Sequence, residues 1–72
     1  MPRNKRIIPE MPLARIMYNV GAKRVSDGAA KELADVLEEV GLRISERAIE
    51  YAKHSGRETV KREDIKLAAK NL

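Results

Sequence analysis

The most regular pattern of hydrophobic positions runs through residues 27–54. Apolar side chains recur there every three or four residues, which is the spacing of one face of an α-helix. Ser26 offers a capping oxygen before this run, and Ser55-Gly56 offers a stop after it. We therefore predict one continuous helix, although Gly41 lies in its interior. The apolar stripe consists of Ala30, Leu33, Leu37, Val40, Ile44, Ala48 and Tyr51.

Two shorter segments flank this helix. Between Pro12 and Gly21, four apolar residues at helical spacing predict a short helix. Lys61 begins a third helix, whose apolar side is expected to extend to Leu72. The intervening residues form two loops, so the predicted fold class is all-α: short helix, loop, long helix, loop, short helix.

The first eight residues differ from the rest of the chain. Residues 1–8 lack helical periodicity, are basic and are followed by Pro9. We expect them to form a flexible basic tail in front of a single folded domain at residues 9–72.

The predicted long helix is too long for the chain that contains it. At 1.5 Å per residue, residues 27–54 would extend roughly 42 Å, whereas a compact globule of 72 residues is only about 28 Å across. Two short helices cannot cover an apolar stripe of that length. A second copy that crosses the first at the middle of the long helix would cover it, and we predict an obligate intertwined dimer.

Composition excludes several classes of function. The chain has no Cys, a single His and two aromatic residues, Tyr18 and Tyr51. These residues provide no nucleophile with its base and no set of metal ligands, so we expect no enzyme, metal, cofactor or small-molecule substrate. No apolar run approaches the roughly 20 residues of a membrane span, and we expect a cytoplasmic protein. Glu38-Glu39 is interpreted as a solvated helix face, since adjacent helical residues point in different directions.

Charge is distributed in blocks along the chain. Residues 15–31 and 51–62 are net basic, and residues 32–50 between them are net acidic. An antiparallel crossing of two long helices would bring a basic block of one copy beside a basic block of the other. The helix N-termini at these edges also favour phosphate. Such a dimer would suit a polyanion such as DNA.

Both predicted loops resemble those of the archaeal histones. The resemblance is carried by Gly21-Ala-Lys-Arg-Val-Ser-Asp at the first loop and by Ala52-Lys-His-Ser-Gly-Arg-Glu-Thr-Val-Lys-Arg-Glu-Asp-Ile at the second. Leu37-Glu-Glu-Val-Gly in the long helix is similar as well, and the similarity extends from Pro12 to Leu72. It implies a histone fold for residues 9–72 and an architectural chromatin protein at the chromosome, whose homodimers bind, bend and wrap double-stranded DNA with little sequence specificity. Higher multimers, nucleosome-like filaments or heterodimers with a paralogue are also implied.

The resemblance also implies roles for individual residues. Arg24 matches an arginine that enters the DNA minor groove. Arg57 and Asp64 match a structural ion pair that fixes the second loop. Tyr51 and His54 match a dimer–dimer contact, and Gly21 matches a small residue where successive turns of an assembly stack. The complete expected DNA-binding set is Arg15, Lys23, Arg24, Ser26, Thr59, Lys61 and Arg62.

Three residues depart from the family pattern. Glu58 stands where the family often has Lys, and Lys23 stands where it often has an acid. Tyr51 replaces a residue that is commonly aliphatic. Because Glu58 would repel phosphate, an alternative function stays open: a histone-fold dimerisation module, similar to some transcription-factor components, with little DNA binding of its own.

Overall fold

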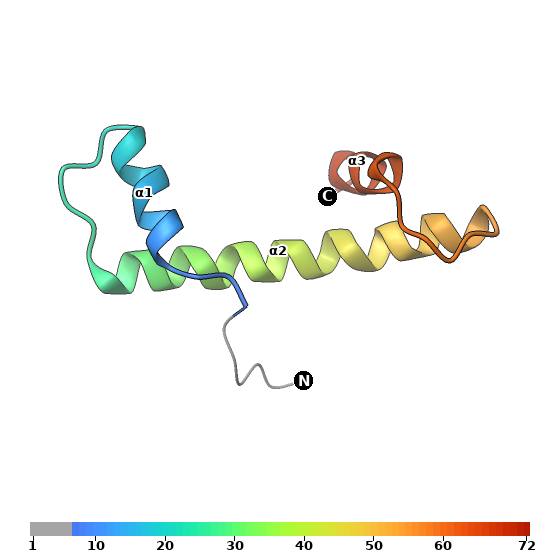
Figure 1. The fold of residues 1–72 in the computed structure, drawn as a ribbon, viewed down its shortest axis with the longest axis horizontal. Helices are drawn as coiled ribbons and strands as arrows, with labels where there is room; N and C mark the ends of the chain where they lie inside the picture. Colours follow the sequence, from blue (N-terminus) through green and yellow to red (C-terminus); the bar gives the residue numbers. More distant parts are fainter. Residues whose placement is uncertain (1–6) are drawn as a thin grey trace. The chain divides into compact units, whose positions relative to one another are not determined.

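A computed structural model describes residues 7–72 and contains three helices and no strand in that range. The helices are α1 (Met11–Asn19), α2 (Asp27–His54) and α3 (Arg62–Lys70), and Figure 1 shows them in chain order. The all-α prediction is confirmed. Most of the predicted basic tail, residues 1–6, lies outside the described residues. The chain divides into two compact units, one ending at Glu39 and the other beginning at Val40.

The first helix of the first unit is α1, which is short because residues near both of its ends favour a helix boundary there. Pro12 lies in the first turn, where its missing N–H costs no hydrogen bond. At the other end, the N–H of Ala22 donates to the carbonyl of Met17 at 3.0 Å, and Gly21 adopts φ +118°. A residue with a Cβ rarely adopts this conformation, so glycine permits the turn that ends α1.

The first half of α2 completes this unit. The N–H of Ala29 donates to the Ser26 Oγ at 3.0 Å, which confirms the predicted N-cap. Leu13 of α1 is buried, as are Ala30 and Ala34 of α2. The small alanine side chains allow one helix backbone to approach the other closely.

The long helix continues through Gly41 without interruption, as predicted, and ends at His54. Its end is closed by two backbone hydrogen bonds at 2.9 Å, from Gly56 to Lys53 and from Arg57 to Ala52. Gly56 adopts φ +72°, the left-handed conformation that this type of helix end requires.

The second unit consists of the last part of α2, the second loop and α3. Its buried apolar residues are Ala48, Ala52 and Ala68. The helix α3 begins one residue later than predicted, with Lys61 as its N-cap. It ends at Lys70, so the prediction that Leu72 lies on this helix was wrong. Leu72 lies beyond the helix end, and 58% of its surface is exposed.

The core of the described chain is small. Its buried apolar residues are Leu13 and five alanines, while many larger apolar side chains remain exposed. These exposed residues lie on all three helices and in the second loop, and they include Ile16, Val36, Leu37, Leu42, Ile49, Val60, Ile65 and Leu67. A carboxylate is buried instead: only 7% of Glu38 is exposed, and its Oε2 has no hydrogen-bond partner among the described residues. The interpretation of Glu38 as part of a solvated face was therefore wrong, whereas Glu39 is exposed.

Candidate nucleic-acid interface

The first group of predicted site residues surrounds the loop between α1 and α2. Lys23 and Arg24 are exposed in this loop, and Arg15 is exposed on α1. Gly21 and Ser26 lie at the two ends of the loop, where they terminate α1 and cap α2 respectively. Two cations are thus presented on a short segment whose ends are both fixed by local backbone geometry.

An ion pair organises the second group, around the loop between α2 and α3. Nη1 of Arg57 donates to Oδ2 of Asp64 at 3.0 Å, and Nη2 donates to Oδ1 at 3.1 Å. The same Oδ2 accepts a 2.8 Å hydrogen bond from the backbone N–H of Lys61. Nη1 of Arg57 also donates to the carbonyl of Thr59 at 2.9 Å. These contacts connect the start of the loop, its centre and the first turn of α3.

The electrostatics of this group follow from those contacts. The guanidinium of Arg57, and next the N–H of Lys61, hold the pKa of the Asp64 carboxyl below its ordinary value, against the opposite effect of burial. Hydrogen bonding to Asp64 raises the pKa of Arg57 in turn. Asp64 is therefore a permanent carboxylate near neutral pH, and its charge is matched by a permanent cation.

The braced loop displays its remaining predicted site residues at the surface. Thr59, Lys61 and Arg62 are exposed, and so is His54 at the end of α2. Because Arg57 is engaged by Asp64, the freely presented cations here are Lys61 and Arg62. The arrangement offers a hydroxyl and two cations on a fixed loop, which is suited to binding phosphate oxygens.

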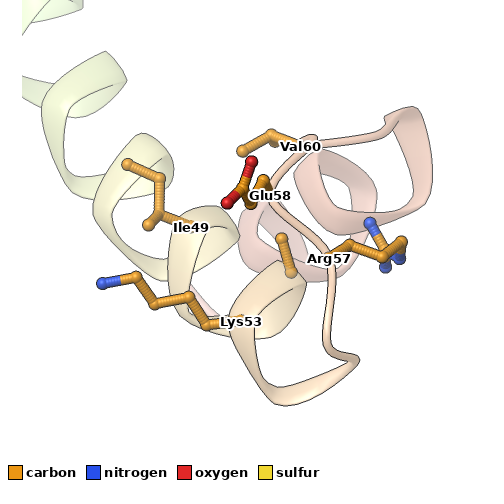
Figure 2. A pocket seen from close by; sticks show the side chains of 6 residues that line it. Ile49, Lys53, Arg57, Glu58 and Val60 are labelled. Atoms are coloured by element: carbon orange, nitrogen blue, oxygen red, sulfur yellow. The ribbon is translucent and has the colours of Figure 1, made fainter.

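Glu58 lies in the same loop but beside an apolar pocket. This pocket of about 420 Å³ is lined by Ile49, Ala52, Lys53, Arg57, Glu58 and Val60. Figure 2 shows the Glu58 carboxylate between the side chains of Ile49 and Val60, while Arg57 extends in another direction. The carboxylate therefore lies over apolar surface rather than against Arg57, which precedes it in sequence.

Tyr51 makes a contact that the sequence did not suggest. The Nδ2 of Asn71 donates to the Tyr51 hydroxyl at 3.4 Å and to the carbonyl of Leu67 at 3.1 Å. The phenol of α2 is thereby joined to the residue that follows α3. Nothing in the spacing of the sequence indicated Asn71 as a partner.

The described residues hold no group of three or more His, Cys, Asp or Glu side chains that could bind a metal ion. Among the helices described, none is both long and apolar enough to cross a membrane. Within the described residues, each of the two loops presents cations at the surface.

Comparisons with known proteins agree with this arrangement. Residues 6–69 match the family described as histone-like transcription factor (CBF/NF-Y) and archaeal histone. The chain belongs to this family. Its three helices are those of the histone fold, and the resemblance of its loops to archaeal histones is confirmed.

Two curated members of the family are similar over most of their length. One of the subunits of the archaeal histone HAN1 of Thermococcus zilligii is 48% identical over 63 residues, which covers 88% of this chain and 94% of the relative. Probable archaeal histone 3 of Methanocaldococcus jannaschii is 46% identical over 61 residues, covering 85% and 91% respectively. This histone-fold chain is thus comparable in length to both relatives.

Proposed function

We propose that this chain is an architectural chromatin protein whose homodimers bind and bend duplex DNA with little sequence preference. The observation that carries the proposal is the braced second loop, in which Arg57 and Asp64 hold Thr59 and Lys61 at the surface. A brace of this kind fixes a phosphate-binding loop before DNA arrives, which reduces the entropy lost on binding. Membership of a family that includes archaeal histones supports the same interpretation.

Dimer formation is supported by the apolar surface that the single chain leaves uncovered. Leu37, near the middle of α2, is 38% exposed, and Val36 beside it is 46% exposed. Exposed side chains of this size on every helix are typical of a surface that a partner covers. We propose that this partner is a second copy of the chain, whose α2 crosses the α2 of the first copy near its midpoint.

The DNA-binding roles follow from the position of each cation. In the proposed dimer, the first loop of one copy lies beside the second loop of the other. Arg24 enters the minor groove there, while Lys61 and Arg62 contact phosphates on either side. Arg15 on α1 and Lys23 add further positive charge, and Thr59 donates its hydroxyl to the backbone of the DNA. The Ser26 cap leaves the first N–H groups of α2 directed at a phosphate.

Dimers are proposed to stack through the ends of their long helices. His54 is exposed at the end of α2, and Tyr51 is half-buried one turn earlier. These two residues would form the dimer–dimer contact, and Gly21 would allow successive turns of the resulting filament to approach. The assembly would act on chromosomal DNA in the nucleoid.

Nuclease protection of duplex DNA, with protein added in steps at moderate salt, tests this proposal. We expect a ladder of regularly spaced protected lengths, which His54→Ala reduces to one short length while the dimer persists. A single short length with the wild-type chain would refute stacking and keep the DNA-bending dimer. No protection, with the dimer intact, would refute the DNA-binding function.

The role of Arg24 has its own test. DNA binding releases counterions, so the logarithm of the binding constant falls with the logarithm of salt concentration by about 0.9 for each phosphate neutralised. Arg24→Ala removes two cations per homodimer and should reduce this slope by about 2. Lys70→Ala, on the last turn of α3, is the matched control. An equal effect of both substitutions would contradict the assignment.

One observation favours a second candidate, a histone-fold protein that pairs with other proteins. Glu58 lies in the second loop, where a carboxylate opposes phosphate binding, and the family description includes transcription factors. A stable dimer that leaves duplex DNA unprotected even at low salt would support this candidate.

A further inference from the structure

The pocket beside the second loop combines an apolar floor with a carboxylate, that of Glu58. Ile49 is 44% exposed and Val60 is 39% exposed, and together with Ala52 they form the floor. Glu58 extends over this floor in Figure 2. Within residues 7–72, no ion pair or hydrogen bond engages its carboxylate.

The other charged groups near the pocket do not satisfy Glu58. Arg57 directs both of its terminal nitrogens to Asp64 and to the carbonyl of Thr59. Lys53 lines the pocket as well, yet in Figure 2 its amino group extends away from the Glu58 carboxylate. Glu58 is exposed, so its carboxylate is accessible to a cation arriving from outside the chain.

The first loop has the complementary properties. Lys23 is exposed and has no ion-pair partner in the described part of the chain. Ala22 precedes Lys23 and Val25 follows Arg24, and both apolar side chains are only half-buried, so they are available to contact an apolar floor. The loop therefore presents two cations, Lys23 and Arg24, between two apolar residues. Because Arg24 is assigned to the DNA minor groove in the proposed function, Lys23 is the cation that remains for the carboxylate of the pocket.

We propose that the pocket of each copy receives the first loop of its partner, and that Lys23 pairs with the partner's Glu58. This inference rests on the proposed homodimer, because the crossing of its two long helices is what brings the loops together. Two α2 helices that cross antiparallel at their midpoints place residue 26 of one beside residue 55 of the other. The loops next to these positions then meet. Twofold symmetry creates the pair twice in each dimer.

The pair determines which chain is accepted as a partner. A paralogue with an acid at the first loop and a lysine at the second would place like charges together at both contacts. Such repulsion discriminates between partners even where attraction adds little affinity. The pair also neutralises Glu58, so that its carboxylate no longer opposes the phosphates bound by Lys61.

Exchange between two charge-reversed variants tests the proposal without DNA. Lys23→Glu alone and Glu58→Lys alone each produce like-charge contacts in their homodimers. In the heterodimer of the two variants, both contacts join opposite charges: one is the original pair and the other is the same pair with its charges exchanged. The variants are mixed in equal amounts, one labelled with ¹⁵N, refolded together from denaturant and weighed by native mass spectrometry. Random mixing would give half of all dimers as heterodimer. If each exposed contact favours opposite over like charges about twofold, the heterodimer should make up clearly more than half of the dimers.

The reverse mixture provides a second measurement. Wild type mixed with the double variant Lys23→Glu, Glu58→Lys contains matched homodimers, so the heterodimer should fall to about 20%. Both deviations should shrink towards one half in 1 M salt, where the screening length is about 3 Å. The control pair Glu46→Lys and Lys70→Glu reverses two exposed charges away from these loops and should mix statistically.

Each outcome bears on a separate claim. Statistical mixing of the variants at low salt, with dimers present, would overturn the Lys23–Glu58 pair and leave the homodimer intact. Absence of any dimer of the wild-type chain at micromolar concentration would overturn the proposed dimer itself. If the single variants do not fold alone but fold when mixed, the proposal is supported.

Discussion

A single carboxylate organises the second loop at the scale of residues. Asp64 accepts hydrogen bonds from the Arg57 guanidinium and from the Lys61 backbone, so it acts both as an ion-pair partner and as a cap for α3. Removing it would leave Arg57 holding only the Thr59 carbonyl. The loop and the helix start would loosen together.

Acid is expected to weaken this arrangement. Because the pKa of Asp64 is lowered in the folded chain, its contribution is complete above the ordinary pKa of a carboxyl group, about 4, and is lost as pH falls below it. Asp64→Asn should therefore reduce the difference in Tm between pH 6 and pH 3. Glu63→Gln, in the same first turn, is the control. An unchanged pH dependence in the Asn variant would contradict the assigned role.

The local contacts of the site residues, such as the Arg57–Asp64 ion pair, were predictable, whereas contacts between distant parts of the chain were not. The loop motifs indicated Arg24, Arg57 and Asp64 because family patterns are local in sequence. The bond from Asn71 to Tyr51 and the burial of Glu38 were missed. Both depend on how one helix packs on another, and a charged residue gives no signal in a hydrophobic pattern when it is buried.

At the scale of elements, the local caps determined the boundaries. Ser26, Gly21 and Gly56 marked helix ends correctly, because each supplies a specific hydrogen bond or backbone conformation. The end of α3 was placed too late, at Leu72. No glycine or proline stops that helix, so the apolar pattern alone gave no signal for its end.

The proposed crossing of two α2 helices predicts how a substitution at Gly41 affects the stability of the dimer. A Cβ added there meets nothing within 4 Å in the chain, and a helix-favouring residue should stabilise a solitary helix. In the proposed dimer the same position lies at the crossing of two α2 helices. Gly41→Met is therefore expected to lower the free energy of dimer unfolding by about 1–3 kcal/mol through overpacking.

Denaturant unfolding of the Gly41→Met variant measures this effect. Arg43→Met serves as the control, because Arg43 is exposed and lies outside the apolar stripe of α2. A Gly41 variant as stable as the control, or more stable, would place the crossing elsewhere along α2.

The small core has a thermodynamic consequence at the scale of the whole molecule. If folding requires association, stability depends on protein concentration. For a dimer of two 72-residue chains, a tenfold increase in concentration should raise Tm by about 5 °C. Calorimetry at two concentrations measures this shift, and a constant Tm would indicate a chain that folds alone.

The division of the chain at Glu39 and Val40 also affects how quickly the protein folds. Each compact unit is built from residues close in sequence, so its contacts close only short loops. Chains rich in local contacts fold within microseconds to milliseconds. Each helix–loop–helix half would then form transiently in a single chain and be stabilised only when two chains meet, so the encounter would be the slow step. The refolding half-time should consequently fall in inverse proportion to the protein concentration.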